Sequence, residues 1–373
     1  MERVEKKKLI LFIAIAFGFD LLMCIPMYIG YKMGKDLSAF VLAMMTYPAC
    51  AVILGHMLYG NKEKKIPKVG FIVFLLTSLA LVVVCLLSVV LPETTTTVGG
   101  QSFSNWNLYS QYVLYVGSLV TYIIFWVAGK EKRRNVGFSR NKLMLSIAFA
   151  VLFIVLYFGR IYLSVILTQL INGTSGNQVA ALSAGIFNAT FIGNAIYILC
   201  LFPISFIAYL GEEYGWRYYL QPVLQKKFGL RGGVIVLGIL WGLWHVGADF
   251  LYYTKETGPQ MLVSQLITCF SLAAFFGYVY MKTKNIWLLA FLHFINNNFI
   301  ALITGDVNSI QNQSISWKDL PLAFVIDIVF WIFILAPIYN KKNKDVVLND
   351  SADEVAAAAV NEDAENVVNV NVQ

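Results

Sequence analysis

Long apolar segments constrain the fold of this chain more than any other feature. A helix needs about 20 predominantly apolar residues to cross a bilayer. Segments of about this length lie at about residues 9–31, 37–59, 69–91, 108–128, 143–170, 180–210, 232–250, 261–281, 286–304 and 320–340. The chain is 58% hydrophobic and only 13% charged. We therefore expect an all-α, polytopic transmembrane helical bundle of about ten spans.

The basic residues predict the orientation of this bundle. The net charge is +7, and 23 of the 28 Lys and Arg fall in clusters that ten spans would place on one side of the membrane. The others are Arg160 within a span and four lysines on the opposite side, namely Lys32, Lys35, Lys255 and Lys318. Cytoplasmic loops of membrane proteins carry such an excess. We predict a multi-pass protein of the cell membrane with cytoplasmic N- and C-termini and no nucleic-acid partner.

The chain divides into three parts by composition. Residues 1–142 hold four accessory spans with few polar residues, and residues 143–340 hold the remaining spans, with the polar motifs concentrated within 180–304. Residues 341–373 are acidic and lack aromatic side chains, which is typical of a disordered segment, so we expect a cytoplasmic tail. The Thr- and Gly-rich residues 92–107 are expected to form a flexible outer loop.

Two adjacent carboxylates interrupt the apolar pattern near the end of the sixth segment. Glu212 and Glu213 stand in the run GEEYGWRYYLQP, and ionisable side chains at membrane depth are costly and usually functional. Arg217 lies four residues after Glu213, a spacing that allows an ion pair on one helical face. Glu212 is then left as the carboxylate without a charged partner.

Two histidines lie in later spans with polar or aromatic residues on the same helical face. Trp241 precedes His245 by four residues, and Asn297 follows His293 by four, so each pair shares a face.

Depth in the membrane indicates whether these motifs can meet. If the basic residue at the cytoplasmic end of each span marks the interface, Arg217 being the first, then Glu212 lies roughly 8 Å below it. By the same count His293 lies roughly 13 Å deep and His245 roughly 20 Å deep. We therefore expect one shared cavity in the cytoplasmic half of the bilayer.

This set of side chains suits the activation of water for amide hydrolysis. A carboxylate removed from bulk water can serve as general base, and Glu212 is available for that role. A histidine could share the attacking water, and a His–Asn pair could donate hydrogen bonds to an oxyanion. The sequence lacks a GxSxG signature of a serine nucleophile. The alternative is a zinc ion held by Glu212, His245 and His293, although no HExxH motif is present.

The three motifs together resemble the CPBP family of intramembrane proteases, which includes the CAAX proteases and the bacteriocin-processing Abi proteins. That family shows EExxxR, Phe-xxx-His and His-xxx-Asn or His-xxx-Asp on separate transmembrane helices. The corresponding segments here are 212–217, 241–245 and 293–297. Trp241 stands where the family pattern has Phe, and it keeps an aromatic cavity wall.

The resemblance implies a glutamate-type peptide hydrolase without a cofactor. It implies that Glu212 is the base, assisted by His245, and that His293 and Asn297 form the oxyanion hole. Glu213 and Arg217 would orient the first motif. The implied partners are membrane lipids and a peptide or membrane-protein substrate, whereas the oligomeric state has no signal in the sequence.

A non-enzymatic function is the second hypothesis. Ionisable residues inside spans also occur in proton-coupled carriers, and Asp20, Arg160 and Glu212 are such residues. The chain would then be a membrane transporter or a bacteriocin self-immunity protein with a buried polar network. Asp20 and Arg160 could pair with each other or mark a transport pathway.

Overall fold

The computed structural model describes residues 3–174, 176–305 and 309–340, and it confirms the predicted all-α polytopic bundle. Among these residues, eight helical segments are long and apolar enough to cross a membrane. One of them, Ala189–Trp244, has 56 residues, which is enough for two crossings. It turns at Gly229, whose φ of 77° is outside the helical range. The count of ten spans and the cytoplasmic termini remain predictions.

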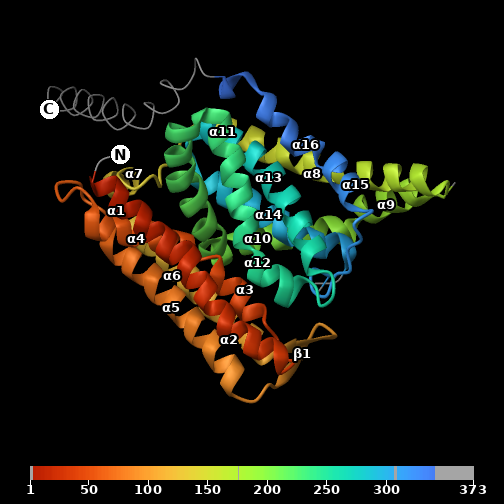
Figure 1. The fold of residues 1–373 in the computed structure, drawn as a ribbon, viewed down its shortest axis with the longest axis horizontal. Coiled ribbons are helices and arrows are strands. Elements are labelled where there is room, and N and C mark those ends of the chain that lie inside the picture. The colour runs from red at the N-terminus through yellow and green to blue at the C-terminus, as the bar shows by residue number, and fades with distance from the viewer. Residues whose placement is uncertain (1–2, 175, 306–308, 341–373) are drawn as a thin grey trace.

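The N-terminal helices form a group of their own on one side of the molecule (Figure 1). The first crossing contains a π-helical turn between two α-helices. The elements of this group are α1 (Arg3–Phe12), η1 (Ile13–Phe19), α2 (Asp20–Lys32), α3 (Ser38–Met44), α4 (Tyr47–Tyr59), α5 (Lys68–Val90), β1 (Thr95–Val98), β2 (Gln101–Ser104) and α6 (Asn105–Val127).

The outer loop expected at residues 92–107 contains an ordered element, which corrects the sequence-based expectation. Strands β1 and β2 pair antiparallel, with Val98 opposite Gln101. Gly99 and Gly100 form the two-residue turn with positive φ values of 59° and 82°, the conformation that tight hairpins require. The four β-branched threonines at 94–97 favour extended backbone, and three of them lie in β1.

The remaining helices form the second group, which holds the three polar motifs (Figure 1). Helix α13 lies between α11 and the C-terminal helices. The short helix α7 (Lys130–Arg134) lies with the N-terminal group (Figure 1). The elements of the second group are α8 (Leu143–Asn172), α9 (Gln178–Ile186), α10 (Ala189–Glu213), the π-helical η2 (Tyr214–Leu220), α11 (Gln221–Trp244), α12 (Val246–Ala248), the π-helical η3 (Asp249–Tyr253), α13 (Gly258–Thr283), α14 (Ile286–Thr304), α15 (Leu320–Ile326), α16 (Ile328–Trp331), and the 3₁₀ turns η4 (Ile332–Leu335) and η5 (Pro337–Tyr339).

Two of the predicted apolar segments are not single continuous helices. Residues 180–210 are divided between α9 and α10, because Asn188 caps α10 by accepting a hydrogen bond from Phe191 N at 2.8 Å. Residues 320–340 form four short helices, with a break at Asp327 where ψ is 2°. The Asp327 carboxylate pairs with Arg160 at 3.5 Å. The predicted tail at 341–373 lies outside the described residues, and the domain boundaries at 142 and 340 remain predictions.

Two glycines allow α10 and η2 to approach α4 and the turn before it. A Cβ atom on Gly211 would collide with the Met45 carbonyl oxygen, and one on Gly215 would collide with Pro48. Small residues four apart are a common means of close helix packing in membranes. The two glycines flank the glutamate pair in the sequence. Their close contacts therefore fix the position of Glu212 and Glu213 against the N-terminal group.

Substitution of Gly211 tests this close approach. We expect Gly211→Ala to lower stability by about 1–3 kcal/mol, because overpacking forces the backbone apart. The measurement is the midpoint of thermal unfolding of the purified protein in detergent. Gly193→Ala in the same helix is the matched control, since no atom lies within 4 Å of its added Cβ. Equal midpoints for the two variants would contradict the role of Gly211.

Candidate active site

The glutamate pair and its arginine are buried at the junction of α10 and η2. Glu212 is 2% exposed, and Glu213 and Arg217 are fully buried. The backbone widens from α-helix to π-helix directly after Glu213, and π-helical turns are frequent at functional sites. The pair is therefore part of the interior of the bundle.

The burial of Arg217 overturns its use as a marker of the membrane interface. Its guanidinium carbon lies 4.2 Å from the Trp241 ring centroid and 5.2 Å from that of Phe276. Its Nε lies 3.2 Å from Glu213 Oε2. A carboxylate and two aromatic faces thus take the place of water around this charge. Arg217 is therefore not a surface charge, and the depth of Glu212 counted from it stays a prediction.

Glu213 holds two cationic or potentially cationic partners at once. Its Oε2 faces Arg217, and its Oε1 lies 2.9 Å from His293 Nδ1. Since a carboxylate can only accept, the His293 Nδ1 carries the hydrogen of that bond. This contact fixes the ring and directs its Nε2 toward Glu212. The sequence predicted the Arg217 partner but not the His293 partner.

Glu212 has two indole donors and no cation within hydrogen-bond distance. Its Oε2 accepts hydrogen bonds from Trp241 Nε1 at 2.7 Å and from Trp216 Nε1 at 3.2 Å. Its Oε1 lies 4.0 Å from His293 Nε2, which is beyond a direct hydrogen bond. One oxygen is therefore fixed by neutral donors, and the other faces a histidine nitrogen.

Trp216 is a site residue that the sequence analysis did not identify, and it is fully buried. Trp216 follows Glu212 by four residues, so helical spacing carried the signal that the two side chains share a face. Phe276, whose ring lies against Arg217, is far from it in the sequence, so no helical spacing predicted their contact.

His245 stands where α11 ends and α12 begins. Its Nδ1 lies 2.8 Å from the Trp241 carbonyl oxygen, and a carbonyl can only accept, so Nδ1 carries a hydrogen. The neutral ring then presents a lone pair on Nε2. Asp249, a weaker candidate for orienting this ring, is fully buried, and neither carboxylate oxygen has a hydrogen-bond partner within the described part of the chain.

A cavity of about 190 Å³ brings the later motifs together. Trp241, His245, His293 and Asn297 all line it, whereas Glu212 does not and is reached through its contact with Trp241. Asn297 Oδ1 accepts a hydrogen bond from Asn296 at 3.0 Å, so its Nδ2 is the group that could donate to a substrate. The cavity thus has the His245 lone pair, the Asn297 amide and the His293 ring in its wall, and the Glu212 carboxylate lies behind Trp241.

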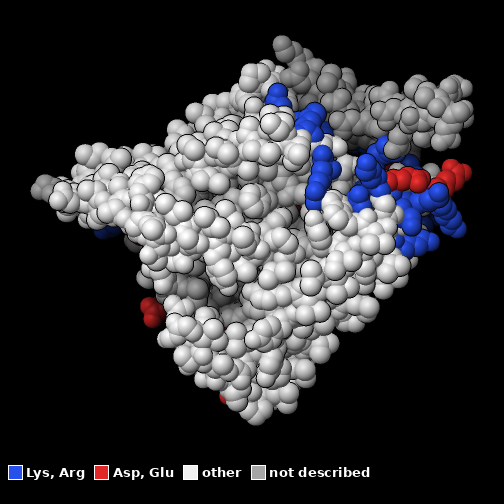
Figure 2. Space-filling model, turned by 180° about the vertical axis from the view of Figure 1, so that it is seen from behind, with Lys and Arg blue, Asp and Glu red and all other residues white. Residues whose placement is uncertain are grey.

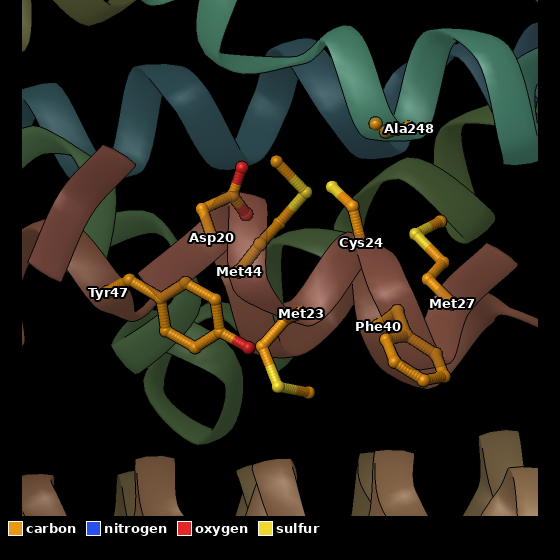
Figure 3. A pocket seen from close by; sticks show the side chains of 9 residues that line it. Asp20, Met23, Cys24, Met27, Phe40, Met44, Tyr47 and Ala248 are labelled. Atoms are coloured by element: carbon orange, nitrogen blue, oxygen red, sulfur yellow. The ribbon is translucent and has the colours of Figure 1, made fainter. Parts of the chain in front are cut away.

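Asp20 and Arg160 do not pair with each other. Arg160 pairs with Asp327. Asp20 lies in a separate small cavity of about 10 Å³, beside Cys24 and Met44 (Figure 3), a volume that holds about one water.

The zinc alternative stays a prediction. Across the described ranges, no group of three or more His, Cys, Asp or Glu side chains is arranged to hold a metal. The contact of His245 Nδ1 with the Trp241 carbonyl leaves Nε2 available, as in a metal-binding histidine that donates its other N–H to a carbonyl.

Comparison with known proteins identifies the region that carries the site. Residues 193–299 match the family model described as "Type II CAAX prenyl endopeptidase Rce1-like". The match confirms the predicted CPBP resemblance and supports a membrane-embedded endopeptidase that acts on peptides. No curated protein and no solved structure gives a significant match. All three motifs lie within the matched range.

Removal of the buried guanidinium tests the electrostatic centre of the site. We expect Arg217→Met to destabilise the protein by about 3–5 kcal/mol, because it leaves the Glu213 carboxylate less compensated. The combined Glu213→Gln and Arg217→Met variant should recover part of this loss. Thermal unfolding midpoints measure both effects.

The exposed pair of Lys226 and Glu5, at 3.5 Å, provides the control for that comparison. Lys226→Met should change stability by less than about 1 kcal/mol, as is usual for surface ion pairs. A loss of similar size in Lys226→Met and Arg217→Met would contradict a special role for the buried pair.

Proposed function

We infer that this chain, a CPBP-type protein by its residues 193–299, is an intramembrane endopeptidase of the cell membrane in which Glu212 activates the attacking water. The observation that carries this proposal is the unequal environment of the two glutamates. Glu213 is engaged by Arg217 and His293, whereas Oε1 of Glu212 has no cation within hydrogen-bond distance. Glu212 is thus the carboxylate that can accept a proton.

The proposed reaction assigns one role to each group. Glu212 takes a proton from water, and the His245 Nε2 lone pair accepts the second hydrogen bond of that water. The water oxygen attacks the peptide carbonyl carbon, and Glu212 returns the proton to the leaving nitrogen as the C–N bond breaks. No metal takes part in these steps.

We assign stabilisation of the oxyanion to the third motif, which spans residues 293–297. Asn297 Nδ2 and His293 Nε2 are the candidate donors. Because His293 Nδ1 already carries the hydrogen shared with Glu213, Nε2 donates only when the ring holds both protons. Glu213 and Arg217 therefore act on the reaction through the position of His293, whose ring Glu213 holds by the contact at Nδ1.

The depth of the site in the bilayer is part of this proposal. Counted along the helices, His293 lies roughly 13 Å from the cytoplasmic interface and His245 roughly 20 Å from it. Since the hydrocarbon core is about 30 Å thick, we propose a cavity that extends from the cytoplasmic half toward the middle of the bilayer.

The carrier hypothesis loses its principal argument. It depended on Asp20 and Arg160 as unexplained buried charges, and Arg160 is compensated by Asp327. Asp20 lies in a cavity with room for about one water, and no continuous path follows from it. Peptide hydrolysis is therefore the function that the site supports best.

Conservative removal of the proposed base tests the mechanism. Purified full-length protein in lipid nanodiscs is incubated with a pool of apolar peptides, and products are identified by mass spectrometry. We expect Glu212→Gln to abolish cleavage, since the amide oxygen can still accept from the indoles but cannot take a proton. Asn297→Ala should lower kcat by about 10²- to 10³-fold, the usual cost of one oxyanion donor.

Glu256→Gln in an exposed loop is the matched control and should cleave at the wild-type rate. Unfolding midpoints establish that each variant is folded. Wild-type cleavage by a folded Glu212→Gln variant would refute the assignment of the base.

Elemental analysis of the same preparation tests the metal-free mechanism. We expect activity to survive a strong chelator, because the proposed steps use no metal ion. Stoichiometric zinc whose removal abolishes cleavage, and whose return restores it, would show the zinc mechanism instead.

A further inference from the structure

A second, polar pocket adjoins the catalytic cavity. It has a volume of about 600 Å³. Its lining comes from the turn after α2, the segment before β1, the loop after η3 and the segment at 311–312. The residues that carry charge there are Lys32, Lys35, Asp36, Glu93 and Lys255.

The lysines of this pocket depart from the general distribution of charge, in which most Lys and Arg are predicted on the cytoplasmic side. Most Lys and Arg on the face shown in Figure 2 gather at one end of the molecule. Only four lysines are predicted on the opposite side of the membrane, and three of them, Lys32, Lys35 and Lys255, line this one pocket. The fourth, Lys318, does not line it. Positive charge on that side is therefore concentrated at a single place.

The lysine side chains are positioned from different elements. Lys35 Nζ donates to the Leu91 carbonyl at 2.7 Å, and Lys32 Nζ lies 5.4 Å from the Tyr28 ring centroid. Lys255 is exposed on the loop between η3 and α13. Three lysines, two at the end of α2 and one on the loop after η3, thus line one pocket, which gives it the positive charge that an anion site needs.

The two carboxylates of the pocket are engaged by local donors. Asp36 accepts from Ser38 N at 3.0 Å and from Ser38 Oγ at 3.2 Å, and Glu93 Oε2 accepts from Asp36 N at 3.1 Å. Burial raises the pKa of the Asp36 carboxyl, the Ser38 hydrogen bonds oppose that rise, and the charge of Glu93 adds to it. Three lysines against two carboxylates leave an excess of one positive charge, 3 − 2 = +1.

A single stretch of chain separates this pocket from the catalytic cavity. Ile310 and Gln313 line the cavity, while Gln311 and Asn312 between them line the polar pocket. This stretch is held in place by backbone bonds from Asn312 N to the Tyr252 carbonyl at 3.4 Å and from Gln313 N to the Tyr253 carbonyl at 2.7 Å. The two volumes therefore share a wall.

Successive residues of the shared wall line the two volumes in turn. Tyr252 lines the polar pocket, and the next residue, Tyr253, lines the cavity. A peptide that occupies the cavity and leaves it past residues 310–313 would bring its flanking residues to the lysines.

We propose that this pocket is a recognition site for acidic side chains in a segment of the peptide substrate that flanks the cleaved bond. The inference rests on the proposed protease function, because it assigns the pocket to the same substrate. Charge complementarity of this kind contributes to selectivity and to the rate of association. The predicted preference is for substrates whose outer flank is acidic.

Binding of a model peptide tests the pocket without cleavage. A fluorescein-labelled short Glu-rich peptide and its Gln-substituted counterpart are titrated against full-length protein in phosphatidylcholine nanodiscs, with fluorescence anisotropy as the readout. We expect the Glu-rich peptide to bind more tightly, and added salt to weaken it. The combined Lys35→Gln and Lys255→Gln variant should lose roughly tenfold in affinity, as expected for two partly exposed charges.

Lys318→Gln is the matched control, because it removes the fourth outer lysine without touching the pocket, and it should bind like wild type. The Glu212→Gln variant should also bind normally, which separates failure of this proposal from failure of the catalytic one. Equal binding by wild type and the double variant, with both folded, would overturn the proposal. So would lysine-dependent binding of glycerol phosphate without binding of the Glu-rich peptide, a result that would assign the pocket to lipid head groups.

Discussion

The contact of Glu213 with both Arg217 and His293 is the interaction on which the rest of the site depends. It joins η2 to α14 through 3.2 Å and 2.9 Å contacts inside the bundle. A buried charge without partners would cost several kcal/mol, so this ion pair and the rings of Trp241 and Phe276 have to be assembled together. Assembly of that cluster brings all three motifs to one place.

The backbone around the cluster explains why Glu212 can differ from its neighbour. Successive residues of a helix point in directions about 100° apart, so two adjacent carboxylates meet different surroundings, even though both lie near the His293 ring. Glu213 points toward the arginine and the histidine ring nitrogen, and Glu212 points toward two indoles. Gly211 and Gly215 hold this segment against the N-terminal group. The two roles follow from helical geometry together with close packing on both sides.

Helical spacing made part of this site predictable from the sequence. The rest depends on contacts between different helices, which the sequence does not give. The Glu213–Arg217 pair follows from residues four apart, and the apolar lengths predict a membrane bundle. The contacts of His293 with Glu213 and of Trp241 with Glu212 join different helices, and one sequence gives no measure of which faces meet. The sequence also treated Arg217 as a surface charge, whereas its partners keep it buried.

The distribution of Lys and Arg is informative in two ways. The excess on one side predicts topology, and the few lysines predicted on the other side point to a function. The predicted cytoplasmic excess of Lys and Arg reflects topology, so each of those residues alone says little about function. A lysine predicted on the other side has no such explanation. Three of these four lysines line one pocket, Lys32 and Lys35 at the end of α2 and Lys255 on the loop after η3. The sequence trend does not account for this grouping, and the proposed anionic ligand does.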